Sequence, residues 1–142
     1  MKVRELMSKP VVRIHDDEPV SVAARTLTHY NIGAMPVCGF DGSLCGVITD
    51  RDIVTRCLAA DMHPEQTKVR DVMTRQVLSI APDADAAQAA HIMGVRQVRR
   101  LPVVENGKLC GVITLGDIAH SEENVFEAAD ALVEITSNIS HR

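Results

Sequence analysis

Hydrophobic and polar positions follow the same order twice along this chain. In each half, a short apolar run precedes a polar break rich in carboxylates, and a segment with apolar residues every three to four positions comes next. That spacing predicts amphipathic helices near residues 20–30 and 86–95. Two further apolar runs then flank Asp41-Gly42 or Asn106-Gly107, dipeptides that predict β-hairpins. Each half is therefore predicted to be a β-α-β-β-α unit.

The two halves also share amino-acid identities at corresponding positions. Residues 3–8 (VRELMS) return as 69–74 (VRDVMT), and residues 44–53 (LCGVITDRDI) return as 109–118 (LCGVITLGDI). The spacing between the copies shortens by one residue near the hairpin turns, where length changes are tolerated. A unit of this size buries its apolar face against a second copy. We expect a mixed α/β (α+β) fold in which repeats at 1–62 and 63–121 pack about a pseudo-twofold axis.

The chain continues beyond the second repeat as a predicted amphipathic helix within residues 122–142. Ser121 is the expected N-cap, with Glu122 and Glu123 in the first turn. The expected apolar face consists of Val125, Phe126, Ala129, Leu132 and Val133. This face would either close the pair of repeats like a lid or pack on a second chain.

Composition excludes several classes of function. A net charge of -4 and an aromatic content of 2% argue against a nucleic-acid partner. There is no apolar run long enough to span a bilayer and no secretory stretch near Met1, so we expect a cytoplasmic protein. The cysteines and histidines lack metal-ligand spacing, and no nucleophile motif occurs. We therefore expect no catalytic residues, no metal and no cofactor.

Two cysteines flank the first predicted turn. A two-residue turn would place Cys38 directly opposite Cys45, whereas a loop longer by one residue would pair Val37 with Cys45. We expect the thiols to be small buried groups, with a redox-sensing pair as the minority alternative.

Both halves keep the pattern G-x-x-T-x-x-D where a strand leads into a helix. The threonines Thr49 and Thr114 offer a hydroxyl beside free backbone N–H groups, which is an anion site. The carboxylates of Asp52 and Asp117 lie one turn later on the same face and could accept hydrogen bonds from both hydroxyls of a ribose. The alternative is a plain helix cap with a solvated aspartate.

These motifs, with the Met35-Pro36-Val37 and Leu101-Pro102-Val103 strands, resemble a tandem pair of cystathionine-β-synthase (CBS) domains, a Bateman module. The resemblance covers about residues 1–120. Within the family, the chain is similar to the stand-alone bacterial pairs of the hypoxic response protein type. It implies a non-catalytic regulatory module that binds AMP, ADP, ATP or S-adenosylmethionine in clefts between the repeats. It also implies a homodimer, and a separate effector protein as a further partner.

The resemblance assigns Thr49, Asp52, Thr114 and Asp117 to phosphate and ribose. The adenine would lie against apolar residues, which are Val12, Ile32, Met35 and Pro36 in the first half and Leu78, Val98, Leu101 and Pro102 in the second.

The two halves differ in charge. Arg99 and Arg100 precede Leu101 where the first half has Gly33-Ala34, and Arg51 stands where the second half has Gly116. Arginine matches phosphate geometry, so we expect Arg99 or Arg100, and secondarily Arg51, to contact phosphate at sites of unequal affinity. The alternative function is a dimeric protein-interaction scaffold with vestigial nucleotide clefts.

Overall fold

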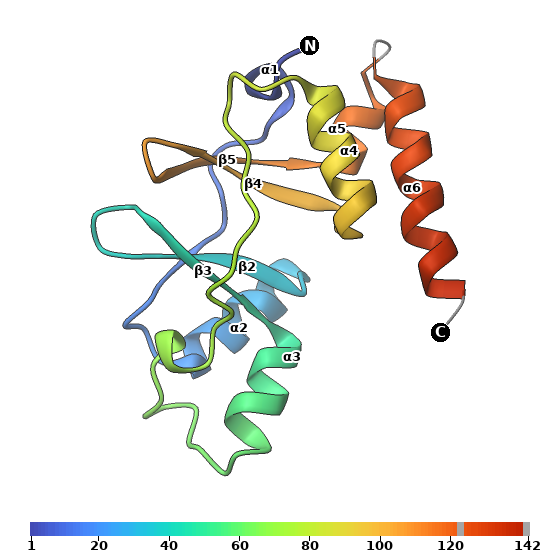
Figure 1. Cartoon of the computed structure of the whole chain (residues 1–142). Helices are drawn as coiled ribbons and strands as arrows, with labels where there is room; N and C mark the ends of the chain where they lie inside the picture. Colours follow the sequence, from blue (N-terminus) through green and yellow to red (C-terminus); the bar gives the residue numbers. More distant parts are fainter. Residues whose placement is uncertain (122–123, 141–142) are drawn as a thin grey trace. The chain divides into compact units, whose positions relative to one another are not determined.

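The computed structural model describes residues 1–121 and 124–140, which group into two compact units (Figure 1). The repeat-1 unit contains residues 12–77 and 107–109. The repeat-2 unit contains residues 1–11 and 78–106 and the chain from residue 110 onward. In the described part of the chain, no helix combines the length and apolar character needed to cross a membrane.

The repeat-1 unit has the predicted β-α-β-β-α order. Its elements are β1 (Ile14–His15), α2 (Val20–Tyr30), β2 (Ala34–Cys38), β3 (Leu44–Thr49), α3 (Asp50–Asp52), η1 (Ile53–Leu58) and η2 (Val69–Asp71). The sheet has the order β1-β2-β3, in which β1 runs parallel and β3 antiparallel to β2. Helix α2 buries Val20, Ala23 and Leu27, as its spacing predicts. It ends at Asn31, whose left-handed conformation (φ 53°) is typical of helix termini.

The two hairpin turns differ in length, as the shortened spacing predicts. The first joins β2 to β3 through residues 39–43, whereas the second consists of Asn106 and Gly107 alone. Both of these residues have positive φ, 54° and 79°, as a type I′ turn requires. The second turn therefore has the conformation expected from its sequence.

The register around the cysteines differs from both predicted pairings. Val37 pairs with Gly46, and Cys38 pairs with Leu44, because the register shifts between Val37 and Cys38. Such a bulge leaves one residue of the partner strand unpaired, and here that residue is Cys45. Its thiol donates to the Val37 carbonyl at 3.3 Å. The predicted Cys38–Cys45 and Val37–Cys45 pairs are therefore both wrong.

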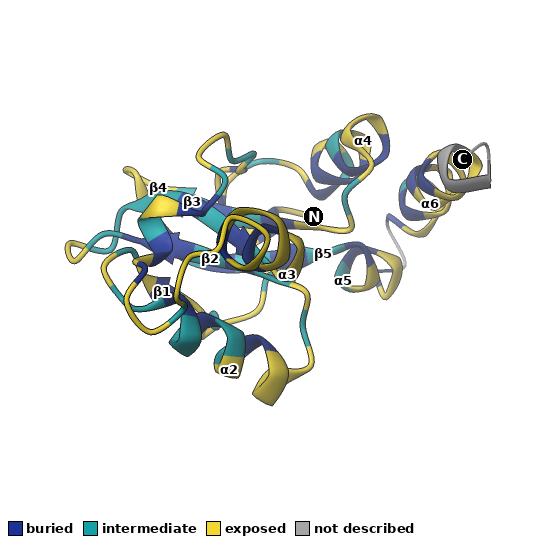
Figure 2. Cartoon of the chain, turned by 90° about the horizontal axis from the view of Figure 1, so that it is seen from below, coloured by how far each residue is buried: buried dark blue, intermediate teal, exposed yellow. Residues whose placement is uncertain are grey.

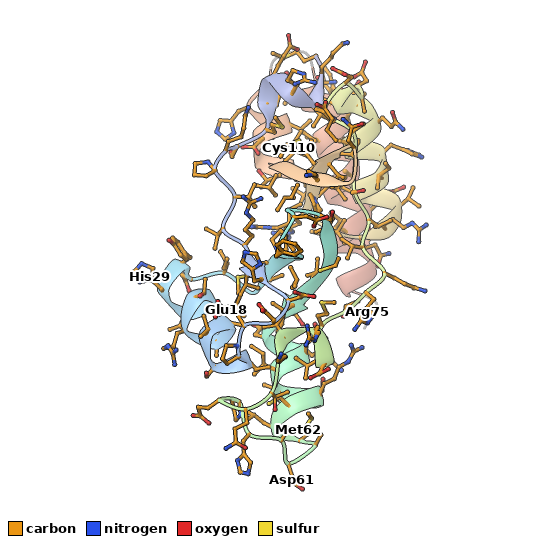
Figure 3. The ribbon with its side chains drawn as sticks, turned by 90° about the vertical axis from the view of Figure 1, so that its left-hand side faces the viewer. Glu18, His29, Asp61, Met62, Arg75 and Cys110 are labelled. Carbon is orange, nitrogen blue, oxygen red and sulfur yellow. The ribbon has the colours of Figure 1, made fainter. Side chains whose placement is uncertain are left out.

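The second helix of repeat 1 begins as one α-helical turn and continues as the π-helix η1. The Ala59 N–H donates to the Val54 carbonyl at 2.9 Å, and the Met62 N–H donates to the Cys57 carbonyl at the same distance. Both bonds span five residues, one more than in an α-helix. Figure 3 shows Asp61 and Met62 where this segment ends. π-Helical turns often accompany functional sites, and η1 directly follows Asp52.

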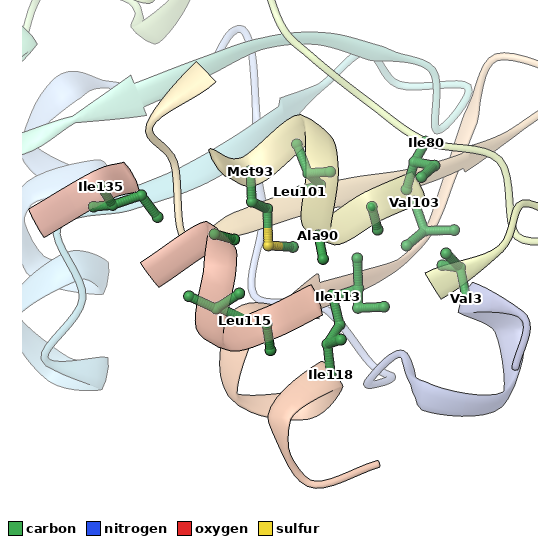
Figure 4. Close-up of a cluster of buried hydrophobic side chains, with 13 residues drawn as sticks. Val3, Ile80, Ala90, Met93, Leu101, Val103, Ile113, Leu115, Ile118 and Ile135 are labelled. Carbon is green, nitrogen blue, oxygen red and sulfur yellow. The ribbon is translucent and has the colours of Figure 1, made fainter. Parts of the chain in front are cut away.

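The repeat-2 unit has the order α-β-β-α between added helices at its two ends. The first strand predicted for this half is reduced to a single parallel bridge between Ile80 and Val103. The elements of this unit are α1 (Val3–Leu6), α4 (Ala86–Arg96), β4 (Arg100–Glu105), β5 (Lys108–Thr114), α5 (Leu115–Ala119) and α6 (Val125–Ser140). Aliphatic side chains from this unit form its core (Figure 4), and the largest that are fully buried are Met93, Leu101, Ile113 and Ile118. Cys110, labelled in Figure 3, lies on β5, and its thiol donates to the Val103 carbonyl at 3.3 Å.

Helix α6 packs against α4 and α5 with a face other than the predicted one (Figure 2). The buried residues are Ala128, Ala131 and Ile135. All members of the predicted apolar face are exposed, with Phe126 at 80% and Val133 at 61%. The physical reason is the close approach of α4, where a Cβ on Gly94 would lie 3.1 Å from the Ala131 Cα. The predicted first-turn residues Glu122 and Glu123 lie outside the described residues.

The segments that open the two repeats, here called the leading segments (residues 3–8 and 69–74), each complete the unit of the other repeat. Ser8 and Val112 exchange two backbone hydrogen bonds at 2.8 and 3.2 Å. Val47 and Thr74 exchange two bonds of 2.9 Å in the repeat-1 unit. The compact units therefore cross the repeat boundaries that the sequence predicts.

Candidate functional site

The first copy of the G-x-x-T-x-x-D motif forms a capping box at the start of α3. The Asp52 N–H donates to the Thr49 hydroxyl at 2.9 Å, and the Thr49 N–H donates to an Asp52 carboxylate oxygen at 3.1 Å. This reciprocal pair satisfies two backbone donors that a helix start leaves open. Thr49 can play this role because it ends β3 in an extended conformation (φ -115°, ψ 160°).

The second copy has the same geometry at the start of α5. The Asp117 N–H donates to the Thr114 hydroxyl at 3.0 Å, and the Thr114 N–H donates to the Asp117 carboxylate at 2.9 Å. The capping role that the sequence left as an alternative is therefore present in both copies. It uses one oxygen of each carboxylate and leaves the other oxygen for further partners.

The glycine of each motif allows a leading segment to approach. A Cβ on Gly46 would lie 2.7 Å from the Met73 sulfur and 2.8 Å from the Thr74 carbonyl oxygen. A Cβ on Gly111 would lie 2.7 Å from the Met7 sulfur. At Gly46 the backbone carbonyl blocks a Cβ, so glycine is required there. At Gly111 the nearest backbone atom, the Ser8 carbonyl oxygen, is 3.2 Å away, and a Cβ would first displace the methionine side chain. The motif glycine and the leading-segment methionine thus form one packing unit in each half.

The two aspartates differ in their remaining partners. The Thr74 hydroxyl lies 3.3 Å from both carboxylate oxygens of Asp52, and the Arg56 Nε lies 3.9 Å from one of them. Asp52 is only 7% exposed. Asp117 is half-buried, and Thr114 is the partner found for its carboxylate within the described residues.

The backbone of Arg99 lies beside the second motif. The Leu115 N–H donates to the Arg99 carbonyl at 2.8 Å, which places Arg99 and Arg100 next to the start of α5. In repeat 1 the Asp50 N–H donates to the Gly33 carbonyl at 3.0 Å, so a glycine occupies the equivalent place. Arg99 and Arg100 are exposed.

The predicted apolar residues fall into two groups. Met35 and Leu101 are 1% exposed and belong to the hydrophobic cores. The other six are partly buried, and these are Val12, Ile32, Pro36, Leu78, Val98 and Pro102. Arg51 is exposed on α3, and its counterpart Gly116 would place a Cβ no closer than 3.6 Å to the Thr114 hydroxyl.

Sequence reasoning missed Arg56 and Thr74 as neighbours of Asp52. Arg56 follows Asp52 by four residues, a spacing that places two side chains on one helix face. That spacing was therefore an available signal. Thr74 lies far along the chain, and its contact depends on the exchange of leading segments.

Comparison with known proteins identifies the family to which this chain belongs. The family model described as CBS domain matches residues 3–59 and 69–124, so the chain belongs to the CBS-domain family as a tandem pair. The fold is the α+β fold of that family.

Similar proteins include small bacterial relatives. The uncharacterized protein YlbB of Bacillus subtilis is 38% identical over 95% of this chain and 91% of its own length. Hypoxic response protein 1 of Mycobacterium tuberculosis is 34% identical over 82% of this chain and 81% of its own length.

Two solved structures are informative. Hypoxic Response Protein I, solved with two coordinated zinc ions, has a TM-score of 0.76 at 33% identity over 85% of this chain and 99% of its own. The CBS pair of protein MJ0100, solved with 5′-methylthioadenosine and S-adenosyl-L-methionine, has a TM-score of 0.69 at 28% identity over 84% of this chain and 93% of its own. Within residues 1–121 and 124–140 no three His, Cys, Asp or Glu side chains gather as a metal site.

Proposed function

We propose that this CBS-domain protein is a non-catalytic regulatory module that binds an adenosine-containing nucleotide through its Thr–Asp motif. The observation that carries the proposal is the second motif, where the Thr114 hydroxyl and the Asp117 carboxylate are fixed 3.0 Å or less from each other's backbone N–H. One carboxylate oxygen remains for the hydroxyls of a ribose. A pre-positioned acceptor loses little entropy when a ligand binds.

Charge and apolar surface beside this motif support the same ligand class. Arg99 and Arg100 are exposed next to the helix start, where a guanidinium can bind a phosphate through two parallel hydrogen bonds. Leu78, Val98 and Pro102 are partly buried and offer an apolar surface for a purine. The MJ0100 pair supports the choice of an adenosine compound, because it was solved with two such ligands. AMP, ADP, ATP and S-adenosylmethionine are the candidates.

The test compares two Asp→Asn variants in the repeat-2 unit. In Asp117→Asn, the amide oxygen can still accept from the Thr114 N–H, but the NH₂ group replaces the free acceptor. Asp85→Asn is the matched control, because Asp85 caps α4 by accepting from the Ala87 N–H at 3.0 Å and asparagine caps helices equally well.

Thermal unfolding is measured with each nucleotide. A ligand at 100 times its dissociation constant stabilises the folded state by about 2.7 kcal/mol. We expect this shift in the native chain and in Asp85→Asn, and its loss in Asp117→Asn. A flat response of the native chain to all four nucleotides would contradict the proposal.

A protein-interaction scaffold is the second candidate function, and the exposed face of α6 favours it. Val125, Phe126, Leu132 and Val133 are between 41% and 80% exposed on one helix face. Contiguous apolar patches of this kind often mark protein contacts, and a second copy of the chain would be the first partner to test.

The double variant Phe126→Glu, Val133→Glu leaves the packing face intact and should convert a dimer to monomers in light scattering. Val95→Glu, which adds the same charge at a 56% exposed valine of α4, is the control. An unchanged mass in the double variant would exclude this face as the interface.

A further inference from the structure

The two Thr–Asp motifs of this chain are alike in sequence and different in what surrounds their carboxylates. A ribose offers two hydroxyls, and holding both requires a carboxylate with accessible oxygens. The question is therefore which of the two aspartates has an oxygen left for a ligand. Asp52 and Asp117 differ in how many of their carboxylate oxygens have a partner within the protein.

Both carboxylate oxygens of Asp52 already have a partner within the protein. A carboxylate has about four acceptor positions. One is taken by the Thr49 N–H, and the Thr74 hydroxyl lies at 3.3 Å from both oxygens. The Arg56 guanidinium adds a positive charge at 3.9 Å. With 7% of its surface exposed, Asp52 presents almost nothing to solvent.

Arg56 is held in place independently of Asp52. Its Nη1 donates to the Val72 carbonyl at 3.3 Å and to the Met73 carbonyl at 3.1 Å. These two backbone acceptors belong to the leading segment that packs in the repeat-1 unit. A ribose at Asp52 would therefore have to displace the Thr74 hydroxyl and compete with a guanidinium that is anchored at two points.

Among the residues that the structure describes, neither an arginine nor a hydroxyl of the leading segment makes an ion pair or hydrogen bond with the repeat-2 aspartate. Ser121 stands where repeat 1 has Arg56, and its hydroxyl donates to the Met1 sulfur at 3.1 Å. Ser8 stands where repeat 1 has Thr74. Within the described residues, the Asp117 carboxylate has Thr114 as its partner, and the residue is half-buried. The backbone carbonyl of Arg99, an exposed arginine, also accepts from the first residue of α5, at the place where repeat 1 has Gly33.

We infer that Arg56 and Thr74 occupy the Asp52 carboxylate from within the protein, so that each chain binds one nucleotide, at Thr114 and Asp117. The inference rests on the proposed function and specifies which copy of the motif performs it. Arg56 and Thr74 are then specificity-determining residues that set the number of ligands. The duplicated motif of repeat 1 acts as a structural cap and joins the leading segment to α3.

The first test measures AMP binding by isothermal titration calorimetry in Asp52→Asn and Asp117→Asn. Asparagine keeps the capping bond in both variants. We expect one AMP per chain in the native protein, the same stoichiometry and affinity within about twofold in Asp52→Asn, and at least a tenfold weaker affinity in Asp117→Asn. Two AMP per chain, with one lost in Asp52→Asn, would overturn the inference and leave the proposed function standing. An absence of binding in the native chain would instead contradict the proposed function itself.

The second test removes the internal partners of the Asp52 carboxylate. The double variant Arg56→Ser, Thr74→Val removes the guanidinium and the hydroxyl, and it introduces the serine that repeat 2 carries at the first position. We expect a second AMP to bind per chain. Arg75→Ser is the matched control. Arg75 is an exposed arginine of the same region that donates to the Arg70 carbonyl at 3.0 Å, and it makes no hydrogen bond or ion pair with Asp52 in the described residues. Circular dichroism verifies that the variants fold. A folded double variant that still binds a single AMP would show that these side chains do not control the first motif.

Discussion

The packing of the motif glycine against the leading segment makes Gly46→Ala the sharpest test of the fold. The added methyl group would lie 2.7 Å from the Met73 sulfur and 2.8 Å from the Thr74 carbonyl oxygen. The thioether can rotate away, but the carbonyl is part of the backbone and can move only if the segment moves. Displacing it strains the two 2.9 Å hydrogen bonds between Val47 and Thr74.

The cost follows from these contacts. Overpacking a filled core costs about 1–3 kcal/mol, and weakening one backbone hydrogen bond adds about 1 kcal/mol. We therefore expect Gly46→Ala to lower the free energy of unfolding by about 2–4 kcal/mol. The control is Gly33→Ala, because a Cβ there would meet only the Asp50 side chain, at 3.5 Å. That variant should be neutral or up to about 1 kcal/mol more stable.

The assay is urea unfolding followed by far-ultraviolet circular dichroism, since the chain has no tryptophan and one tyrosine. The slopes of the transitions are compared so that a change in midpoint reports stability. A Gly46→Ala variant as stable as the native chain would refute the packing argument. Equal destabilisation by both variants would refute it as well, because it would show a general cost of removing glycine.

Other residues give independent predictions. Gly94→Ala should destabilise the repeat-2 unit by about 1–3 kcal/mol in thermal unfolding, because the Cβ would lie 3.1 Å from the Ala131 Cα; a gain in stability, the usual result in an open helix, would contradict the close approach. Asn106→Ala should cost about 1 kcal/mol because φ is 54° there, whereas Asn106→Gly should be neutral; equal costs would argue against the turn type. Burial raises the pKa of the Cys38 and Cys45 thiols. Peptide mapping after iodoacetamide treatment at pH 8 should therefore show that both thiols are alkylated more slowly than glutathione. Alkylation at the glutathione rate would contradict their burial. Because the folded-state pKa values are raised, the neutral thiols stabilise the fold fully below the ordinary thiol pKa of about 8.5, and this contribution is lost as the pH rises above it.

Local sequence signals predicted the elements of the repeat well. The expected helix at 20–30 coincides with α2, and the Asn106-Gly107 turn has the predicted backbone conformation. These features depend on a few neighbouring residues, whose spacing and turn chemistry act locally. The Thr–Asp capping boxes belong to the same group, because a threonine before a helix and an aspartate three residues later interact within one turn.

The features that the sequence did not predict depend on contacts between distant segments. The leading segments exchange between the repeats, so the partners of Gly46 and of Asp52 come from residues 73 and 74. Helix α6 carries two apolar stripes, and the larger side chains favoured the wrong one. The buried stripe contains Ala128 and Ala131 because small residues permit the close approach to Gly94.

The assignment of the nucleotide to the Thr114–Asp117 motif is tested most directly by calorimetry. AMP binding is measured in the native chain, in Asp117→Asn and in Asp85→Asn. All three proteins should have the same fold, since asparagine preserves both caps. We predict saturable binding in the native chain and in Asp85→Asn, and at least a tenfold loss of affinity in Asp117→Asn. Equal AMP affinity in all three proteins would contradict the assignment of the nucleotide to the Thr114–Asp117 motif.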